Sequence, residues 1–440
     1  MCGFIFYLGE KRLSTKKKNE LKKITKLISH RGPDFSSNFI NNNIFAHHCR
    51  LSIQDLKKRS NQPFFSDDKR YMLLFNGEIY NFQILKKNLT KKYIFKTTSD
   101  TEVVLASFLI YGKKFVSKLN GMFSILIFDF KLNEFIVARD PFGQKPLYFY
   151  QDHKCLIISS EIKPIQKLKK LKINKDQIFN YFITNNFADD RKTIIKQIFQ
   201  LRGGEIGHFR KKKLNITKFF SKQDIKYKVN KKNNFKNSLK KTIKNHMISD
   251  TKIGIAISSG LDSRSICALL YILKLNRQIF KAYFIEFSDF KIETTEVIRF
   301  CNHFKINLEI IKIKSIDIVK NFEKCLKYNE APLGGIMNIA LFALCKKAKK
   351  DNVKVILGGY GLDEALGGYD ILNPNLNLNS AHSNQLIDGS ILDNSKLIKK
   401  KYKIKKNKSK NFINDNFIHK KQINLLFKSK IPRTLHMIDR

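Results

Sequence analysis

The hydrophobic pattern of the sequence changes once, near residues 221–234, and this change limits the folds that the chain can adopt. Before it, short β-rich runs are joined by tight polar turns, which predicts antiparallel hairpins. After it, apolar runs of strand length alternate with helical periodicity, which predicts a parallel α/β sheet. We therefore expect two domains, an α+β domain of layered antiparallel sheets at 2–210 and an α/β domain at 235–440, joined by a linker at 211–234.

The first domain is expected to contain three hairpins, and the second an alternation of strands and helices. The hairpins pair 122–130 with 134–138, 147–150 with 155–159, and 205–209 with 214–220. A shorter strand at 71–75 is expected to end at Asn76-Gly77, a dipeptide typical of turns. In the second domain the expected strands are 252–257, 280–287, 308–313 and 354–357, and the expected helices are 263–275, 293–304 and 340–350.

The composition excludes several classes of protein. Hydrophobic residues make up 42% of the 440 residues, which is enough to build cores and excludes a largely disordered chain. No apolar run approaches the roughly 18 residues of a membrane-spanning helix, and no basic segment of a signal peptide precedes the short apolar run at 3–8. Seven cysteines without framework spacing argue against a disulfide scaffold. We therefore expect a cytoplasmic protein.

The formal net charge of +47, from 84 Lys and Arg against 37 Asp and Glu, suggests a nucleic-acid or anionic-membrane partner. The excess is mainly Lys spread along the whole chain, with abundant Asn, Ile and Phe and no Trp, a bias that the base composition of a genome explains. We favour a solvated basic surface without a membrane or nucleic-acid partner. A nucleic-acid-associated or non-catalytic protein is kept as the alternative class.

The N-terminal residues predict a nucleophile. Cys2 follows Met1, and its small side chain permits removal of Met1, which leaves Cys2 with a free α-amine. A thiolate is a strong nucleophile, and an α-amine with a pKa of about 7.7–8.0 serves as its base without a His neighbour. By itself this signal is not specific, because a second-position Cys is usually an ordinary N-terminal residue.

Segments further along the chain add groups that suit glutamine. Arg50 is expected to pair with the α-carboxylate in a bidentate fork, and Asp100 and Glu78 are expected to hold the α-ammonium. The Asn76 amide and the Gly77 N–H are expected to stabilise the oxyanion of a tetrahedral intermediate. Taken singly, each has an ordinary alternative, namely a surface ion pair, a helix cap or a plain turn.

As an ordered set behind Cys2, these segments resemble the class II glutamine amidotransferase domain, which is of the N-terminal-nucleophile hydrolase type. The resemblance covers residues 2–210 and implies two antiparallel sheets between helices, with Leu51 and Ile53 also in the glutamine pocket. Further matching motifs lie at 30–34 (His-Arg-Gly-Pro-Asp, a rigid polar turn), 120–123 (Asn-Gly-Met-Phe), 138–143 (Ala-Arg-Asp-Pro-Phe-Gly) and 159–163 (Ser-Ser-Glu-Ile-Lys).

A second site is expected where Ser258-Ser259-Gly260 separates a strand from a helix. Small residues let backbone N–H groups approach a phosphate closely, and the helix N-terminus adds its dipole. The hydroxyls of Ser258 and Ser263 suit phosphate oxygens, and Asp262 suits Mg²⁺. An ordinary Ser- and Gly-rich turn that caps a helix is the alternative.

This loop resembles the pyrophosphate-binding loop of ATP-pyrophosphatase enzymes, usually written SGGxDS, with Ser259 in place of the first Gly. A serine is tolerated there if its φ is negative. A class II glutaminase followed by such a loop resembles the glutamine-hydrolysing asparagine synthetase family, whose second glycine-rich stretch appears at 357–369. The resemblance implies ATP as a substrate and Mg²⁺ as a cofactor. It places Asp363 as a second metal ligand, Glu364 as a support for the loop, and Ile257, Ile285, Gly358 and Gly359 beside the nucleotide.

The resemblance implies a reaction in two parts. Cys2 attacks glutamine, releases ammonia and forms a thioester, which water hydrolyses to glutamate. In the second domain the β-carboxylate of aspartate attacks the α-phosphorus of ATP, and ammonia converts the acyl-adenylate into asparagine and AMP. The expected partners are these small molecules, and a homodimer is left open.

Two departures from the family leave the acceptor open. The catalytic candidate Tyr360 stands where the family usually has Glu. In this it resembles the branch that forms β-lactams and carbapenams, which has a Tyr at this position. A Tyr side chain, with a pKa near 10, is a poorer base than Glu at neutral pH. The stretch 430–440 resembles a segment well inside the synthetase domain, so this domain is expected to be C-terminally incomplete. The alternatives are an amidotransferase acting on another carboxylate, such as a sugar acid, and a chain with glutaminase activity only.

Overall fold

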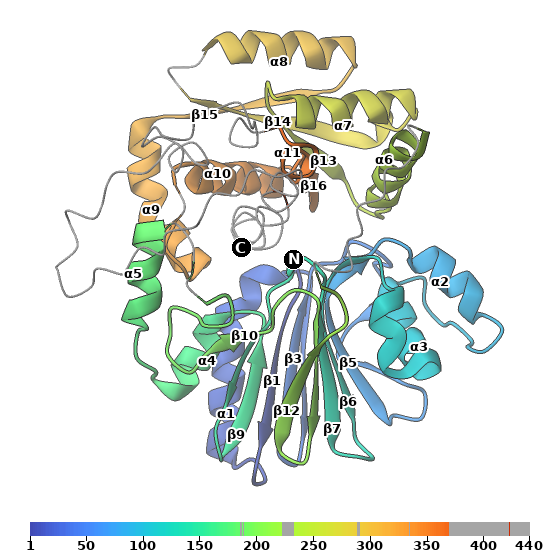
Figure 1. Ribbon diagram of the computed structural model, residues 1–440, viewed down its shortest axis with the longest axis vertical. Coiled ribbons are helices and arrows are strands. Elements are labelled where there is room, and N and C mark those ends of the chain that lie inside the picture. The colour runs from blue at the N-terminus through green and yellow to red at the C-terminus, as the bar shows by residue number, and fades with distance from the viewer. Residues whose placement is uncertain are drawn as a thin grey trace, which may run out of the picture.

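The computed structural model describes residues 1–184, 187, 189–221, 233–287, 291–333, 335–368 and 422. These residues form two domains, the first built mainly on strands and the second on alternating strands and helices (Figure 1). The N-terminus lies at the end of the first domain that faces the second. None of the helices in the described ranges is long and apolar enough to cross a membrane.

The first domain is a sandwich of two antiparallel sheets, as predicted. One sheet has the order β10 (Phe199–Gln200), β8 (Tyr148–Gln151), β9 (Cys155–Ser159), β1 (Gly3–Gly9), β3 (Ile44–Arg50) and β2 (Phe35–Asn41). The other has the order β12 (Lys213–Lys218), β11 (Glu205–Arg210), β7 (Glu134–Arg139), β6 (Gly121–Asp129), β5 (Tyr71–Ile79) and β4 (Phe64–Phe65). Helices α1 (Thr15–Ile24) and α4 (Ile162–Lys169) cover the first sheet, α2 (Phe82–Leu89) and α3 (Asp100–Tyr111) cover the second, and α5 (Lys175–Thr184) follows α4.

Strand β1 lies in the interior of its sheet and is buried along its whole length. Its side chains alternate between two cores, with Phe4 and Phe6 between the sheets and Ile5 and Tyr7 against the helices. Burial on both faces explains why this strand is almost entirely apolar. Because Cys2 directly precedes β1, the rigid sheet fixes where its thiol lies.

The three predicted hairpins are confirmed as β6–β7, β8–β9 and β11–β12. Two expectations are wrong. The strand predicted to end at residue 75 continues as β5 to Ile79, because Asn76 and Gly77 pair with residues 124 and 123 of β6 instead of forming a turn. Residues 213–218, which the predicted linker included, form β12 of the second sheet. Residues 222–232 of that linker lie outside the described residues.

The second domain contains a parallel sheet in the order β15 (Leu308–Ile313), β14 (Ile279–Phe287), β13 (Ile253–Ile257) and β16 (Val355–Leu357). One face is covered by α6 (Asn233–His246), α7 (Leu261–Ile272) and α8 (Lys291–His303), and the other by α10 (Met337–Lys350). The predicted strands and helices are confirmed, whereas α6, α9 (Ser315–Asn329) and the short α11 (Leu362–Leu366) were not predicted. The segment 430–440, on which the incomplete C-terminus was predicted, lies outside the described residues.

The strand order of the second sheet creates a site for a ligand. From β13 the chain forms β14 and β15 on one side and then returns to β16 on the other side. Open α/β sheets bind ligands at the carboxyl ends of the strands where the order reverses in this way. Ser258 follows β13 and Gly358 follows β16, so the fold brings the two predicted loops of the second site together.

Candidate active sites

The candidate nucleophile lies at the end of β1, beside the loop that follows β3. The Cys2 Sγ is 3.4 Å from the Leu51 N–H nitrogen, which donates to it, and 3.6 Å from the Leu51 carbonyl oxygen. Burial raises the pKa of the Cys2 thiol, while the N-terminal ammonium, the Leu51 N–H and Arg50 act in the opposite direction. The thiol is therefore protonated at neutral pH, and it needs a base before it can attack.

Arg31 fixes the backbone of the nucleophile, a role that the sequence did not reveal. Its Nε donates to the Cys2 carbonyl at 2.9 Å, and its Nη1 donates to the buried Glu161 carboxylate at 3.1 Å. A Cβ at Gly3 would lie 2.8 Å from the Arg31 side chain, so glycine at this position makes room for it. The motif at 30–34 drew attention to this residue, but only as part of a turn.

Asn76 and Gly77 lie side by side on β5, as an oxyanion site requires. The Asn76 side chain is 1% exposed, and its Nδ2 has no hydrogen-bond partner among the residues that the structure describes. A buried amide without a partner costs about 1–3 kcal/mol, so it is normally avoided unless a ligand supplies the acceptor. At Gly77 a Cβ would lie 2.1 Å from the Met122 carbonyl oxygen, so only glycine fits this strand position.

Replacing Asn76 with alanine is expected to lower kcat for glutamine hydrolysis by about 10²–10³-fold, because one preorganised oxyanion donor is lost. KM should change little, since the amide is expected to act on the intermediate and not on bound glutamine. Steady-state release of glutamate measures both constants. Asn88→Ala, at an exposed position of α2, is the matched control. A normal kcat for Asn76→Ala would contradict the oxyanion role.

Arg50 is buried at the end of β3, but its guanidinium is already engaged. Its Nη1 donates to the Lys57 carbonyl and the Asn61 side chain, and its Nη2 donates to the carbonyls of Gln54 and Asp55, at 2.5–3.1 Å. These contacts use four of the five N–H groups of the side chain. The predicted bidentate fork therefore requires at least one carbonyl to be exchanged for the substrate carboxylate. None of the four acceptors carries a charge, which favours that exchange.

Glu78 and Asp100 form the predicted acid pair. Asp100 accepts the Ile79 N–H at 3.0 Å, and Glu78 accepts the Gln54 side-chain amide at 2.6 Å. Burial raises the pKa of Asp100 to about 6. Burial and the Asp100 carboxylate raise the pKa of Glu78 well above its usual value, whereas Lys145 and the N-terminal ammonium lower it. Two acids held together in this way bind a cation favourably, because the cation relieves their repulsion.

The affinity for glutamine is expected to fall as the pH drops below about 6. Asp100 then takes up a proton and loses the charge that attracts the α-ammonium, so KM rises toward pH 5. A bound ammonium stabilises the carboxylate, so binding at pH 5.5 should release protons, which calorimetry in two buffers detects. Asp100→Asn should have a high KM with a weaker pH dependence. A KM that does not change between pH 5 and 7.5 would contradict this assignment.

The phosphate loop has the predicted strand–loop–helix form. Ser259 does not have a positive φ, which is the condition under which a serine can replace the first glycine of the loop. Ser258 is exposed, whereas Ser263 is buried with its hydroxyl inside the loop. The Ser263 Oγ accepts the Ser258 N–H at 3.0 Å and lies 3.1 Å from the Ser258 Oγ. Gly260 begins the helix with its N–H bonded to the Ser258 hydroxyl at 3.2 Å. Ser263 thus shapes the loop, and Ser258 faces outward.

The second glycine-rich loop packs directly on the phosphate loop. A Cβ at Gly359 would lie 2.9 Å from the Asp262 Cβ, and one at Gly358 would lie 2.6 Å from the Tyr360 ring. The Asp363 N–H donates to the Asp262 carboxylate at 3.2 Å. Glu364 is buried beneath this loop. Because Gly359 allows close approach, the two loops bring the predicted metal ligands to one place.

Asp262 and Asp363 fit a magnesium ion bound together with a nucleotide. Burial raises the pKa of Asp262, and the nearby Asp363 carboxylate contributes to the rise, a repulsion that a divalent cation would relieve. Among the described residues, no group of three His, Cys, Asp or Glu side chains is placed to hold a metal ion by itself. Magnesium in nucleotide enzymes usually takes one or two carboxylates and completes its shell with phosphate oxygens and water.

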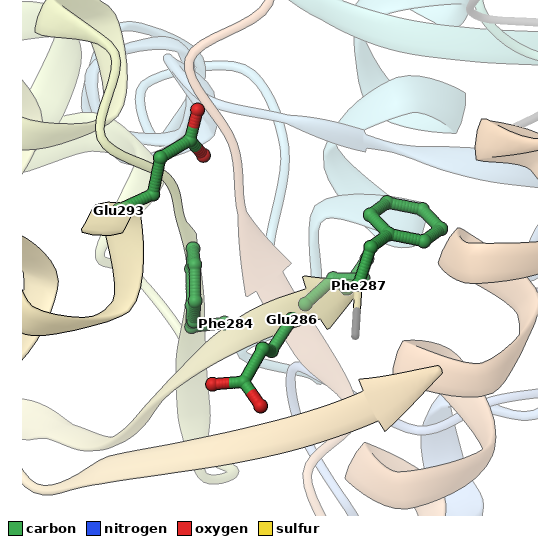
Figure 2. A pocket seen from close by; sticks show the side chains of 5 residues that line it. Phe284, Glu286, Phe287 and Glu293 are labelled. Atoms are coloured by element: carbon green, nitrogen blue, oxygen red, sulfur yellow. The ribbon is translucent and has the colours of Figure 1, made fainter. Parts of the chain in front are cut away.

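A pocket of about 200 Å³ lies at the carboxyl end of β14. Figure 2 shows that Phe284, Glu286 and Phe287 come from this strand end and Glu293 from the start of α8. Ile285, predicted to lie beside the nucleotide, also lines this pocket. Ile257 was also predicted to lie beside the nucleotide, but its side chain is buried in the core that contains α7.

These features define a class of protein. A cysteine at the head of an inner strand of a double antiparallel sheet, with an acid pair and an amide that has no partner among the described residues, matches the arrangement predicted for an N-terminal-nucleophile amidotransferase. In this chain that domain is followed by a parallel sheet in which the phosphate loop and the second glycine-rich loop meet where the strand order reverses, between β13 and β16. Open α/β sheets bind ligands at such a position.

Comparison with known proteins gives the family. The glutamine amidotransferase domain model matches residues 1–220, and the asparagine synthase model matches residues 234–430. Asparagine synthetase [glutamine-hydrolyzing] 1 of Bacillus subtilis is 30% identical over 390 residues, which are 86% of this chain and 60% of that protein. A protein of Methanocaldococcus jannaschii assigned as glutamine-hydrolysing asparagine synthetase 2 is 31% identical over 84% of this chain and 76% of its own length. Asparagine synthetase B of Escherichia coli is 26% identical over 84% of this chain and 65% of its own length.

The chain therefore belongs to the glutamine-hydrolysing asparagine synthetase family. It spans about 60% of the length of the Bacillus subtilis relative.

Proposed function

We propose that the chain is a glutamine-dependent asparagine synthetase, which transfers the amide nitrogen of glutamine to aspartate at the expense of ATP. The observation that supports it best is the pairing of two sites in one chain. A thiol with an unpartnered amide donor lies in the first domain, and a phosphate loop with two facing carboxylates lies in the second. The family supports both halves, since its members are named for glutamine hydrolysis and asparagine synthesis.

In the first half-reaction, removal of Met1 frees the Cys2 α-amine, which takes the thiol proton. The thiolate adds to the side-chain carbonyl of glutamine, and the Asn76 amide and the Gly77 N–H stabilise the oxyanion. Collapse of this intermediate expels ammonia and leaves a thioester, which water hydrolyses to glutamate. Arg50, Glu78 and Asp100 hold the α-carboxylate and α-ammonium, and Leu51 orients the sulfur.

In the second half-reaction, the β-carboxylate of aspartate displaces pyrophosphate from ATP and becomes an acyl-adenylate. Ser258, Ser259 and Gly260 would bind the phosphates at the start of α7, where the helix dipole favours negative charge. The N–H groups of Ser258 and Gly260 would exchange their bonds within the loop for phosphate oxygens. Magnesium, held by Asp262 and Asp363, would neutralise charge on the leaving pyrophosphate. Ammonia then replaces AMP at the acyl carbon.

The N-terminus lies at the end of the first domain that faces the second, and the proposed ammonia transfer crosses this interface. Burial raises the pKa of the Cys345 thiol on α10, and the N-terminal ammonium lowers it. The pKa of Tyr360 is raised by burial and by Cys345. Cys345 and Tyr360 are nevertheless open to solvent. Ammonia released at Cys2 would have to pass from the first domain to the second before it is protonated.

Tyr360 favours a second candidate, an amidotransferase whose acceptor is another carboxylate, such as a sugar acid. Its hydroxyl has a raised pKa and is therefore not a base at neutral pH. Tyr360 stands where the family resemblance expects a carboxylate, and a Tyr side chain brings no negative charge to the acceptor pocket at neutral pH.

The test is the release of glutamate, pyrophosphate and asparagine by the purified chain given glutamine, ATP, Mg²⁺ and aspartate. Aspartate-dependent pyrophosphate together with asparagine would establish the synthetase. Pyrophosphate that depends on another carboxylate would favour the second candidate. Glutamate alone would limit the activity to the first domain, and strongly salt-dependent RNA binding without turnover would contradict both candidates.

A further inference from the structure

We infer that the second domain holds the glutamine pocket of the first domain in its working shape, with Asp250 and Lys354 as positioning residues. Both act on the backbone of the loop formed by residues 51–55, called here the 51–55 loop. The inference rests on the proposed glutamine hydrolysis and adds to it. It makes the affinity for glutamine depend on residues outside the amidotransferase domain.

The 51–55 loop touches each part of the glutamine site. Its first residue, Leu51, contacts the Cys2 sulfur through both its N–H and its carbonyl. Gln54 donates its side-chain amide to Glu78, and the carbonyls of Gln54 and Asp55 hold Arg50. A shift of this loop would therefore move the nucleophile's neighbour and the groups that bind both ends of glutamine.

Asp250 holds the loop at two points from the other domain. Its carboxylate accepts the Asp55 N–H at 2.8 Å, and its own N–H donates to the Ile53 carbonyl at 2.9 Å. Asp55 has a φ of 46°, in the left-handed region that costs a non-glycine residue free energy. A charge-assisted bond to the N–H of that residue stabilises the strained conformation.

Lys354 holds the other end of the loop. Its Nζ donates to the Asp34 carboxylate at 2.6 Å and to the Ser52 carbonyl at 3.4 Å. The same Asp34 carboxylate accepts the Ser52 N–H at 2.7 Å. Asp34 thus fixes Ser52 within the first domain, and Lys354 ties this pair to the second domain.

The two holding residues lie just before neighbouring strands of the parallel sheet. Asp250 precedes β13 and Lys354 directly precedes β16, and these strands pair in register. At their other ends the same strands lead into the phosphate loop and the second glycine-rich loop. The 51–55 loop is therefore attached to the strands that carry the nucleotide site.

These contacts predict a particular kinetic signature. If only a fraction of molecules has the loop in its binding conformation, the apparent affinity for glutamine falls by that fraction, while bound glutamine reacts normally. Asp250→Ala in the full chain is expected to raise KM for glutamine hydrolysis about tenfold and to change kcat less than about threefold. Asp250→Asn should remain close to the unmutated chain, because its side-chain oxygen still accepts the Asp55 N–H. Lys354→Met should raise KM in the same direction.

The measurement is steady-state glutamate release, with Glu323→Ala on the exposed face of α9 as the control and thermal unfolding as the check on folding. An unchanged KM in both Asp250→Ala and Lys354→Met would overturn the inference. Equal losses of kcat in Asp250→Ala and Asp250→Asn, with a lower unfolding temperature, would also overturn it, because that result indicates a purely structural role. Absence of glutamate release from the unmutated chain would instead refute the proposed function. In that case the KD for glutamine, measured by calorimetry with and without Asp250→Ala, tests the inference on its own.

Discussion

Replacing Cys2 with alanine is expected to abolish glutamine hydrolysis, with a loss of at least about 10³-fold in kcat, because the thiol proposed to form the thioester is removed. The change removes one sulfur atom beside Leu51 and leaves β1 and its two cores intact, so the fold should be retained. Glutamate release measures the loss. Any synthesis that uses free ammonia should continue, since the second site does not use the thiol.

Two further results make this test decisive. Cys2→Ser should retain a trace of hydrolysis, because a hydroxyl in the same place is a poorer nucleophile than a thiolate. Mass spectrometry of the unmutated chain, quenched during turnover, should find a glutamyl adduct on a Cys2 that has lost Met1. Full glutaminase activity in Cys2→Ala would show that the N-terminal assignment is wrong.

The second large effect is expected for Asp262→Asn, which should lower pyrophosphate release at least about 100-fold while the basal glutaminase remains. The substitution takes one negative charge from a site built to hold a divalent cation, and it leaves Asp363 alone to bind it. An asparagine at this position still accepts the Asp363 N–H, so the contact between the two loops is kept.

Pyrophosphate is measured with saturating aspartate over a range of Mg²⁺ concentrations. A higher Mg²⁺ requirement in Asp262→Asn would support a ligand role, and Glu323→Gln on α9 should leave the Mg²⁺ requirement unchanged. If Asp262→Asn released pyrophosphate at the normal rate, the phosphate-loop assignment would fail.

The sequence predicted the two domains because local patterns determine hairpins and βα units. The turn at Lys211 and Lys212, for example, has positive φ at both residues and closes β11 and β12 as predicted. The prediction from local patterns failed at Asn76-Gly77. There the local preference for a turn is overridden by pairing with β6, which lies about 45 residues away along the chain. Local preference is a weak guide where such pairing decides the outcome.

Cys2, Asn76 and Asp262 became candidates because of their own chemistry, and their roles stay predictions. Residues whose role depends on a distant contact were not predicted. Arg31 acts through the Cys2 carbonyl, and Asp250 acts through backbone groups of the other domain. A basic or acidic residue next to a strand carries no signal that tells such a partner from solvent. For Arg50 the sequence suggested the ligand, a carboxylate, but not that the carbonyls of Gln54 and Asp55 already hold the guanidinium.

The pairing of β1 with β9 sets an order of events during synthesis. Ile5 pairs with Ser159, so β1 reaches its full pairing only after β9, about 150 residues later in the chain, has been made. The hairpin of β8 and β9 needs only local contacts, whereas closing β1 onto β9 spans most of the first domain. Contacts between distant parts of a chain form more slowly than local ones. The strand that carries the candidate nucleophile is therefore expected to be among the last parts of its sheet to be enclosed.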